Sequence, residues 1–182
     1  LWASKERLEG AEGLTLLELP DGRRLWRPKP GELVTVGFDG AKRQDSTGLI
    51  GTHVASGFQW VIGVWSRPEN AADDWEVDDD DVDLALAETF ETYKVWRAYC
   101  DPPFWWDRIK SWAGRYGHKR IIEWDTNTKR REMAYALKAY AEAMSNELTH
   151  DGDAVFAAHI GNARKRATNI KSDDGHPMWH IQ

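Results

Sequence analysis

Residues 33–39 read LVTVGFD, an apolar run rich in β-branched side chains that ends in an aspartate. Such a run is typical of a buried central strand. Two further strand-like runs follow, TGLIGTHVA at 47–55 and FQWVIGVW at 58–65. Only Ser56 and Gly57 separate them, which suits a two-residue hairpin. The three runs predict an antiparallel meander that starts at residue 33.

Beyond residue 65 the apolar spacing changes to that of helices. Val82, Leu86, Phe90 and Tyr93 recur at helical spacing, and Asp81 or Asp83 is the expected N-cap. Further helices are expected over 105–116, ending at Gly117, and from about Thr128 to Met144. Short apolar runs at 97–101 (RAYCD) and 120–124 (RIIEW) predict two more strands. The segment 151–163 is expected to turn at Asp151-Gly152 and continue as a strand or extended segment.

This order, βββαβαβα, predicts an α/β fold with a mixed sheet and helices on both faces. Three antiparallel strands come first and parallel strands follow, which is the RNase H-like order. Periodicity alone leaves doubly wound and ferredoxin-like layouts open. Residues 33–182 are expected to form this domain, and residues 1–32, with Pro-Asp-Gly and Pro-Lys-Pro-Gly turns, to form a connector.

Composition excludes some classes of protein. No apolar run approaches the roughly 20 residues that span a bilayer, so no membrane association is expected. The single cysteine, Cys100, excludes an internal disulfide framework and is expected to be a buried strand residue. The GxxxxGK[ST] phosphate loop is absent, so this chain is not itself an ATPase of that type.

The net charge of −6 and the pI of about 5.5 argue against nucleic acid as a partner. The acidic run at 78–81 inflates that charge, however, and bound cations would reverse the local field of a carboxylate site. Basic residues gather in short clusters whose interpretation as helix surface or DNA contact stays open: Lys119, Arg120, Lys129, Arg130, Arg131, Arg164, Lys165 and Arg166.

Two aspartates have the placement that metal chemistry needs. Asp39 ends the first strand and Asp101 ends the fourth. If these strands are parallel neighbours, both carboxylates emerge at the same edge of the sheet. Mg²⁺ prefers oxygen ligands and needs only one or two protein carboxylates, and two such ions can promote hydrolysis of a phosphodiester. A lone aspartate after a strand is more often a turn or cap residue, so the prediction depends on the pair.

The loop after Asp39 adds three candidates. Asp45 is predicted to return beside Asp39 as a further metal ligand, although an Asx-type turn explains it nearly as well. Lys42 and Arg43 face either a DNA phosphate or solvent. A zinc site at His150, Asp151, Asp153 and His159 is disfavoured because the spacing fits no compact zinc pattern. The tryptophans are expected in the core: Trp60, Trp65, Trp105, Trp106, Trp112 and Trp124.

Three stretches resemble the nuclease half of a tailed-phage terminase large subunit, over about residues 31 to 170. They are VTVGFDGAKRQDSTGLIG, YCDPPFWWDRIKSWAGRYG and LTHDGDAVFAAHIGNARKR. The resemblance implies an RNase H-like fold and a Mg²⁺- or Mn²⁺-dependent endonuclease with two divalent cations, which cuts concatemeric double-stranded DNA. Matched to the family's motifs, Asp39 and Asp101 are catalytic metal ligands and Asp45 is an additional acid.

The same resemblance implies partners and a boundary. Residues 1–32 would be the tail of a preceding ATPase domain, and portal and small terminase subunits would be partners in the host cytoplasm. Such nucleases carry a third acid in a C-terminal helix, and this chain shows none, so that helix is expected beyond Gln182. The late acids Asp173 and Asp174 are expected in a hairpin turn. Two alternatives stay open: a non-catalytic DNA- or portal-docking module, and another RNase H-like nuclease of the resolvase or transposase type.

Overall fold

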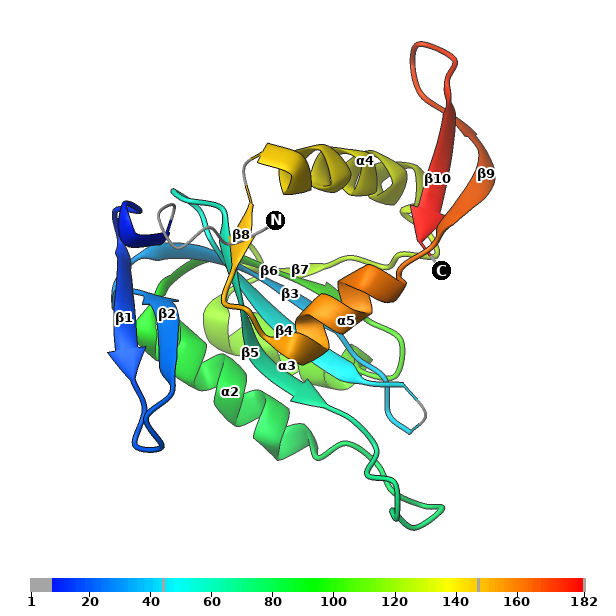
Figure 1. The fold of residues 1–182 in the computed structure, drawn as a ribbon. Coiled ribbons are helices and arrows are strands. Elements are labelled where there is room, and N and C mark those ends of the chain that lie inside the picture. Colours follow the sequence, from blue (N-terminus) through cyan, green and yellow to red (C-terminus); the bar gives the residue numbers. More distant parts are fainter. Residues whose placement is uncertain (1–7, 44, 147, 182) are drawn as a thin grey trace.

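A six-stranded mixed sheet forms the centre of the computed structural model, which describes residues 8–43, 45–146 and 148–181 (Figure 1). The meander comprises β3 (Leu33–Asp39), β4 (Thr47–His53) and β5 (Phe58–Trp65), with antiparallel neighbours. This confirms the predicted meander. The turn between β4 and β5 is longer than expected, because β4 ends at His53 and the Gly57 N–H donates to the His53 carbonyl (2.9 Å).

Parallel strands extend the sheet on both sides of the meander. β6 (Lys94–Asp101) pairs with β3, and β7 (Ile121–Glu123) pairs with β6. At the other edge, the short β8 (Thr149–His150) pairs with β5. The order β7-β6-β3-β4-β5-β8 is therefore the predicted RNase H-like mixed sheet with one additional edge strand that the sequence did not predict.

One face of the sheet packs against two helices, α2 (Asp79–Thr92) and α3 (Trp106–Tyr116). Alternate residues of β3 are buried on this face, and Phe38 contacts Trp105 and Trp112 edge to face, with ring centroids 5.1 and 5.2 Å apart. The N-cap of α2 is Asp78, not Asp81 or Asp83 as expected, because the Asp78 carboxylate accepts from the Asp80 N–H (2.9 Å). α3 ends at Gly117 as predicted, with φ of 100°.

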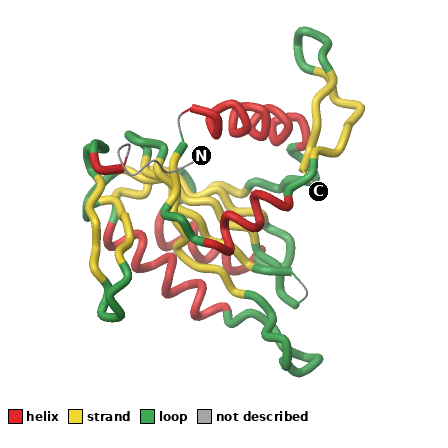
Figure 2. Tube along the Cα trace, viewed as in Figure 1, coloured by secondary structure: helices red, strands yellow, loops and turns green. Residues whose placement is uncertain are grey.

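The opposite face is covered by α4 (Arg130–Asn146) and α5 (Ala154–Asn162), and a hairpin of β9 (Lys165–Lys171) and β10 (Pro177–Ile181) follows (Figures 1 and 2). β10 lies beside the N-terminal end of α4. The strand expected over 151–163 is wrong: after the predicted turn at Gly152, Asp153 caps α5 by accepting from the Phe156 N–H (2.8 Å). Asp173 and Asp174 lie in the turn between β9 and β10, as expected.

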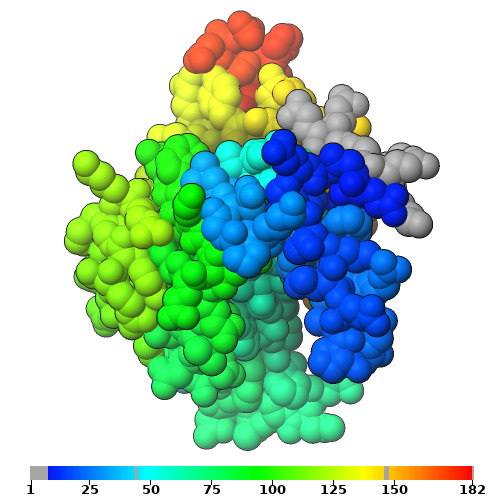
Figure 3. Space-filling view, turned by 90° about the vertical axis from the view of Figure 1, so that its left-hand side faces the viewer, coloured from blue at the N-terminus to red at the C-terminus, as the bar shows by residue number. Residues whose placement is uncertain are grey.

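Residues 14–28 form a hairpin of β1 (Leu14–Glu18) and β2 (Arg24–Pro28), where the sequence predicted only a connector. In Figure 3 these blue strands lie against the body, and the C-terminal hairpin rises at the top. Leu8 and Leu14 belong to the main core, and Arg27 pairs with Asp151 (3.1 Å). The assignment of residues 1–32 to the tail of a preceding domain stays a prediction, and residues 1–7 lie outside the described residues.

None of the helices in the described part of the chain is long and apolar enough to cross a membrane.

Candidate metal centre

The two aspartates predicted as metal ligands lie side by side. In the parallel pair of β3 and β6, Asp39 is the register partner of Asp101. Neighbouring strands are about 4.8 Å apart, and side chains in register point to the same face of the sheet. Both carboxylates therefore emerge together, on the face opposite Phe38 and Cys100. This is the arrangement that the sequence predicted.

Both carboxylates line two adjoining spaces between the sheet and α4. The first, which we call the central hollow, has a volume of about 580 Å³ and apolar walls that include Ile50, Tyr99 and Met133. The second, the outer hollow, has a volume of about 510 Å³ and opens toward Arg130 and His180. The acid pair thus lies at the junction of an apolar space and a polar one.

The negative charge of Asp39 is opposed by its surroundings. Burial raises the pKa of the Asp39 carboxyl, and the carboxylates of Asp101 and Asp45 raise it further. Within the described residues, no basic side chain forms an ion pair with any of these three aspartates. An uncompensated cluster of carboxylates is the donor set that a hard divalent cation prefers.

Thr126 orients Asp101. Its hydroxyl donates to Asp101 Oδ2 (2.8 Å), and its backbone N–H donates to Asp101 Oδ1 (3.4 Å). A hydrogen-bonded carboxylate of this kind is held in one orientation, as the ligands of metal sites commonly are. The sequence prediction missed Thr126, which lies three residues after the end of β7, because no local pattern indicates its contact with Asp101.

Asp45 is exposed in the loop between β3 and β4 and is close enough to Asp39 to raise its pKa. The start of that loop is fixed by close packing at Gly40: a Cβ there would lie 2.3 Å from Nε1 of the buried Trp105. Thr47 closes the loop by donating its hydroxyl to the Ala41 carbonyl (2.6 Å). The loop therefore leaves β3 with a fixed geometry directly after Asp39.

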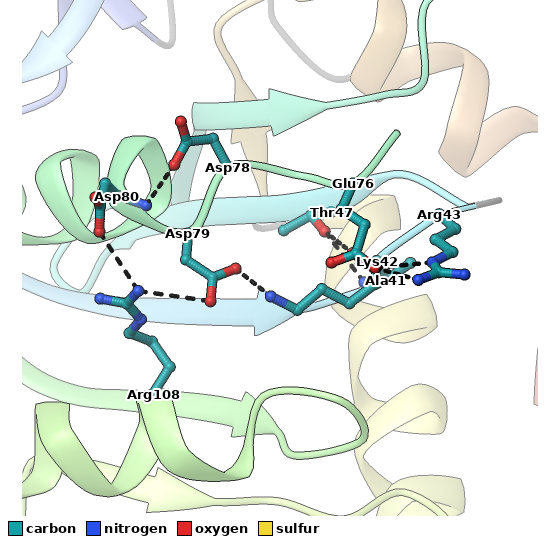
Figure 4. A network of polar contacts seen from close by, with 9 residues as sticks. All are labelled: Ala41, Lys42, Arg43, Thr47, Glu76, Asp78, Asp79, Asp80 and Arg108. Atoms are coloured by element: carbon teal, nitrogen blue, oxygen red, sulfur yellow. Dashed lines mark hydrogen bonds and ion pairs between the residues drawn. The ribbon is translucent and has the colours of Figure 1, made fainter. Parts of the chain in front are cut away.

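Lys42 and Arg43, predicted to contact nucleic acid, are engaged with acidic residues that precede or begin α2 (Figure 4). Lys42 forms an ion pair with Asp79 and lies over the Trp105 ring, 4.0 Å from its centroid. Arg43 Nε donates to Glu76 (2.8 Å). Contact of these two residues with DNA stays a prediction. Their ion pairs attach the loop between β3 and β4 to the start of α2 and to the segment before it.

The remaining candidates have structural roles. Burial raises the pKa of the Cys100 thiol to about 12, so it is a neutral core group and no nucleophile. Asp151 accepts from Arg27 (3.1 Å) and from the Val61 N–H (3.3 Å), so its carboxylate ties β2 and β5 together. Trp60, Trp105 and Trp112 are in the core as predicted, whereas Trp106 is 45% exposed and that prediction is wrong.

Across residues 8–43, 45–146 and 148–181, no group of three or more histidines, cysteines or acids is placed to hold a metal ion. Of the late acids, Asp173 is paired with Arg131 (2.6 Å). The described site thus consists of the Asp39–Asp101 pair with Asp45 nearby. A third acid outside these residues stays a prediction.

Comparison with known proteins places this geometry in context. No protein-family model matches the chain. It is 27% identical over 157 residues to the Gene 13 protein of Mycobacterium phage L5, and 28% over 147 residues to that of phage D29. These alignments cover 81% and 76% of this chain but 26% and 24% of the phage proteins. The chain therefore spans about a quarter of the length of the curated relatives it matches.

Solved structures share the fold. The nuclease domain of the large terminase of Thermus phage P74-26 superimposes with a TM-score of 0.55 at 14% identity, over 95% of this chain and 84% of that one. The large terminase nuclease of thermophilic phage G20c, solved with bound magnesium, gives 0.54 at 11% identity, over 97% and 86%. The chain has the RNase H-like fold of these phage terminase nuclease domains.

Proposed function

We propose that this chain is the nuclease domain of a phage terminase large subunit and that it hydrolyses the phosphodiester bonds of double-stranded viral DNA. The observation that carries the proposal is the register of Asp39 with Asp101 at the ends of two parallel strands. The uncompensated charge of the pair and the shared fold support it. Because the whole relatives are about four times longer, packaging activity and the portal and small-subunit partners belong to this proposal as well.

Asp39 and Asp101 would hold divalent cations, Mg²⁺ or Mn²⁺, and Asp45 would contribute a further acidic oxygen. Cations held there would stabilise the charge that develops on the attacking and leaving oxygens of a phosphodiester. The protein's own part is positional: Thr126 fixes the orientation of Asp101, and packing at Gly40 fixes the direction in which the chain leaves Asp39.

The test is plasmid cleavage in Mn²⁺ by the chain and by its Asp39→Asn and Asp101→Asn variants, which keep side-chain size and remove the charge. We expect each variant to lose at least about a hundredfold in cleavage rate, since loss of groups that only support a metal ligand already costs about 10–100-fold. Asp174→Asn, in the exposed turn of the C-terminal hairpin, is the matched control and should cut normally.

Normal cleavage by either site variant would contradict the assignment. If the wild-type chain binds DNA but neither binds Mn²⁺ nor cuts, the non-catalytic docking module is the correct description. If it cuts branched DNA in preference to linear duplex, a resolvase-type nuclease replaces the terminase assignment. Circular dichroism of each variant establishes that the fold is retained.

A further inference from the structure

Two arginines beside the acid pair have no acidic partner among the described residues. Arg130 opens α4 and lines the outer hollow together with Asp39 and Asp101. Arg166 lies in β9 and lines a third space of about 330 Å³, the hairpin hollow, which Arg130 also lines. Both side chains are exposed, and neither guanidinium has an ion pair or hydrogen bond in the described part of the chain.

The C-terminal hairpin holds these two arginines next to each other. Arg166 is the register partner of His180 across the strand pair. His180 Nε2 donates to the Arg130 carbonyl (2.8 Å), which ties β10 to the first residue of α4. His180 and Ile181 line both the outer hollow and the hairpin hollow, so the two spaces adjoin. One basic surface therefore continues directly from the acid pair.

The neighbouring cations are already engaged. Arg131 is paired with Asp173 (2.6 Å), and Lys165 lies over the Trp179 ring, 4.4 Å from its centroid. Lys129 donates to the Glu123 carbonyl (3.1 Å). Arg130 lines the same hollow as the two carboxylates and Arg166 lines the adjoining one. In a chain with a net charge of −6, these unpaired arginines are available to an external anion.

We propose that Arg130 and Arg166 bind the phosphodiester backbone of duplex DNA beside the acid pair. The inference rests on the proposed nuclease function and adds the residues that position the substrate. Guanidinium groups match phosphate oxygens with two parallel N–H donors. The carboxylates of Asp39 and Asp101 repel a polyanion, so flanking cations are needed to hold the duplex with a phosphate facing them.

The experiment measures binding of a fluorescent duplex of arbitrary sequence by anisotropy, in EDTA, over a series of salt concentrations. Each phosphate contact contributes about 0.9 to the slope of log K against log salt concentration. Arg130→Ala and Arg166→Ala should therefore each reduce the slope by about 0.9, which is about eightfold weaker binding at roughly 0.1 M salt. Since backbone contacts carry no sequence information, the loss should be the same for unrelated duplexes.

Two matched controls remove the same charge elsewhere. They are Lys138→Ala and Lys171→Ala. Lys138 lies on α4 and Lys171 on β9 at the far end of the hairpin, and neither residue lines the outer or hairpin hollow. Their slopes should stay close to that of the wild type. Equal slope losses in controls and arginine variants would overturn the inference, and so would unchanged slopes in the arginine variants or a wild type that binds no duplex.

The binding assay contains no divalent metal, so its outcome is separate from that of the cleavage assay. Loss of cleavage in Asp39→Asn with unchanged binding slopes in the arginine variants would leave the nuclease assignment standing and reject the arginine contacts. Normal cleavage by Asp39→Asn together with reduced slopes in the arginine variants would reject the nuclease site and leave a DNA-binding surface.

Discussion

The surroundings of Asp39 disfavour the ionised form of its carboxyl group. Burial and two neighbouring carboxylates raise its pKa, and the described residues supply no cation in an ion pair with it. Residues that serve a bound ligand are commonly destabilising when the ligand is absent. The raised pKa of Asp39 is therefore expected to make the metal-free protein less stable as pH rises.

The sign follows from linkage. Below the ordinary carboxyl pKa of 3.8, Asp39 is protonated in both the folded and the unfolded chain, and it costs no stability. As pH rises, the unfolded chain releases the proton first, so the folded state loses relative stability until pH exceeds the raised pKa. We expect Asp39→Asn to have a higher Tm than wild type in EDTA at neutral pH, with a difference that shrinks on acidification.

Bound metal should reverse the order of the two melting temperatures, so that the wild type becomes more stable than Asp39→Asn. A cation that binds only the folded state raises Tm with concentration. Mn²⁺ is therefore expected to raise the Tm of the wild type and to leave that of Asp39→Asn nearly unchanged, measured by thermal melts at fixed neutral pH. An Asn variant that is less stable than wild type in EDTA would show that Asp39 has a stabilising partner and is not a strained metal ligand.

The placement of Asp39 and Asp101 could be predicted from sequence because each ends a recognisable strand. Asp39 and Asp101 each follow an apolar run, and parallel pairing then places them in register. The role of Thr126 could not be predicted, because its contact with Asp101 spans 25 residues of chain. Arg130 and Arg131 look equivalent in sequence, and only the fold distinguishes the paired guanidinium of Arg131 from the unpaired one.

At the scale of elements, the passage from β3 into the following loop depends on one glycine. The indole of Trp105, at the start of α3, lies against Gly40 so closely that a Cβ would be 2.3 Å from its Nε1 and 2.7 Å from Phe38 Cζ. Trp105 is fully packed and cannot move aside cheaply. Any side chain at residue 40 must therefore shift either the helix or the end of β3.

We expect Gly40→Ala to lower the free energy of unfolding by about 1–3 kcal/mol, the usual cost of overpacking, and to reduce cleavage because Asp39 is displaced. Gly48→Ala is the control: it lies beside Asp39 in β4, and a Cβ there meets no atom within 4 Å. Urea denaturation of both variants checks the difference. Equal stabilities would mean that the loop, not the indole, accommodates the methyl group.

The element that sequence reasoning misassigned is α5. The run AVFAAHIGN is short, apolar and free of acidic and basic pairs, and such runs do not distinguish a buried strand from a helix by periodicity. The deciding contact is the Asp153 carboxylate with the Phe156 N–H (2.8 Å). An aspartate directly before an apolar run was an available N-cap signal. The β1–β2 hairpin was predicted as a connector, although Pro-Asp-Gly at 20–22 marked its turn.

At the scale of the whole molecule, packing is uneven. The main core of buried side chains extends from Leu8 to Ile121 and joins the sheet to α2 and α3. Beyond it, the described residues bury only Ala134, Phe156 and Met178 among apolar side chains. The wall of the central hollow that α4 forms, and the wall of the outer hollow that α4 and the C-terminal hairpin form, are thus thinly packed.

This division predicts local opening on the α4 side of the acid pair. Elements with few buried apolar contacts open at lower free energy than the core. Amides of α4, β9 and β10 should therefore exchange with deuterium faster than those of β3, β4 and β6. One hydrogen bond that connects α4 to the sheet runs from the Tyr140 hydroxyl to Gln59 Oε1 in β5 (2.8 Å).

Tyr140→Phe removes that hydrogen bond and keeps the aromatic ring. Loss of one hydrogen bond costs about 1 kcal/mol, so exchange in α4 should accelerate about fivefold. β3 amides in the same sample serve as the internal reference and should keep their protection, because their exchange depends on the main core. Equal acceleration in α4 and β3 would show that the molecule opens as one unit. An acceleration confined to α4 would mean that the wall facing Asp39 and Asp101 opens independently of the main core.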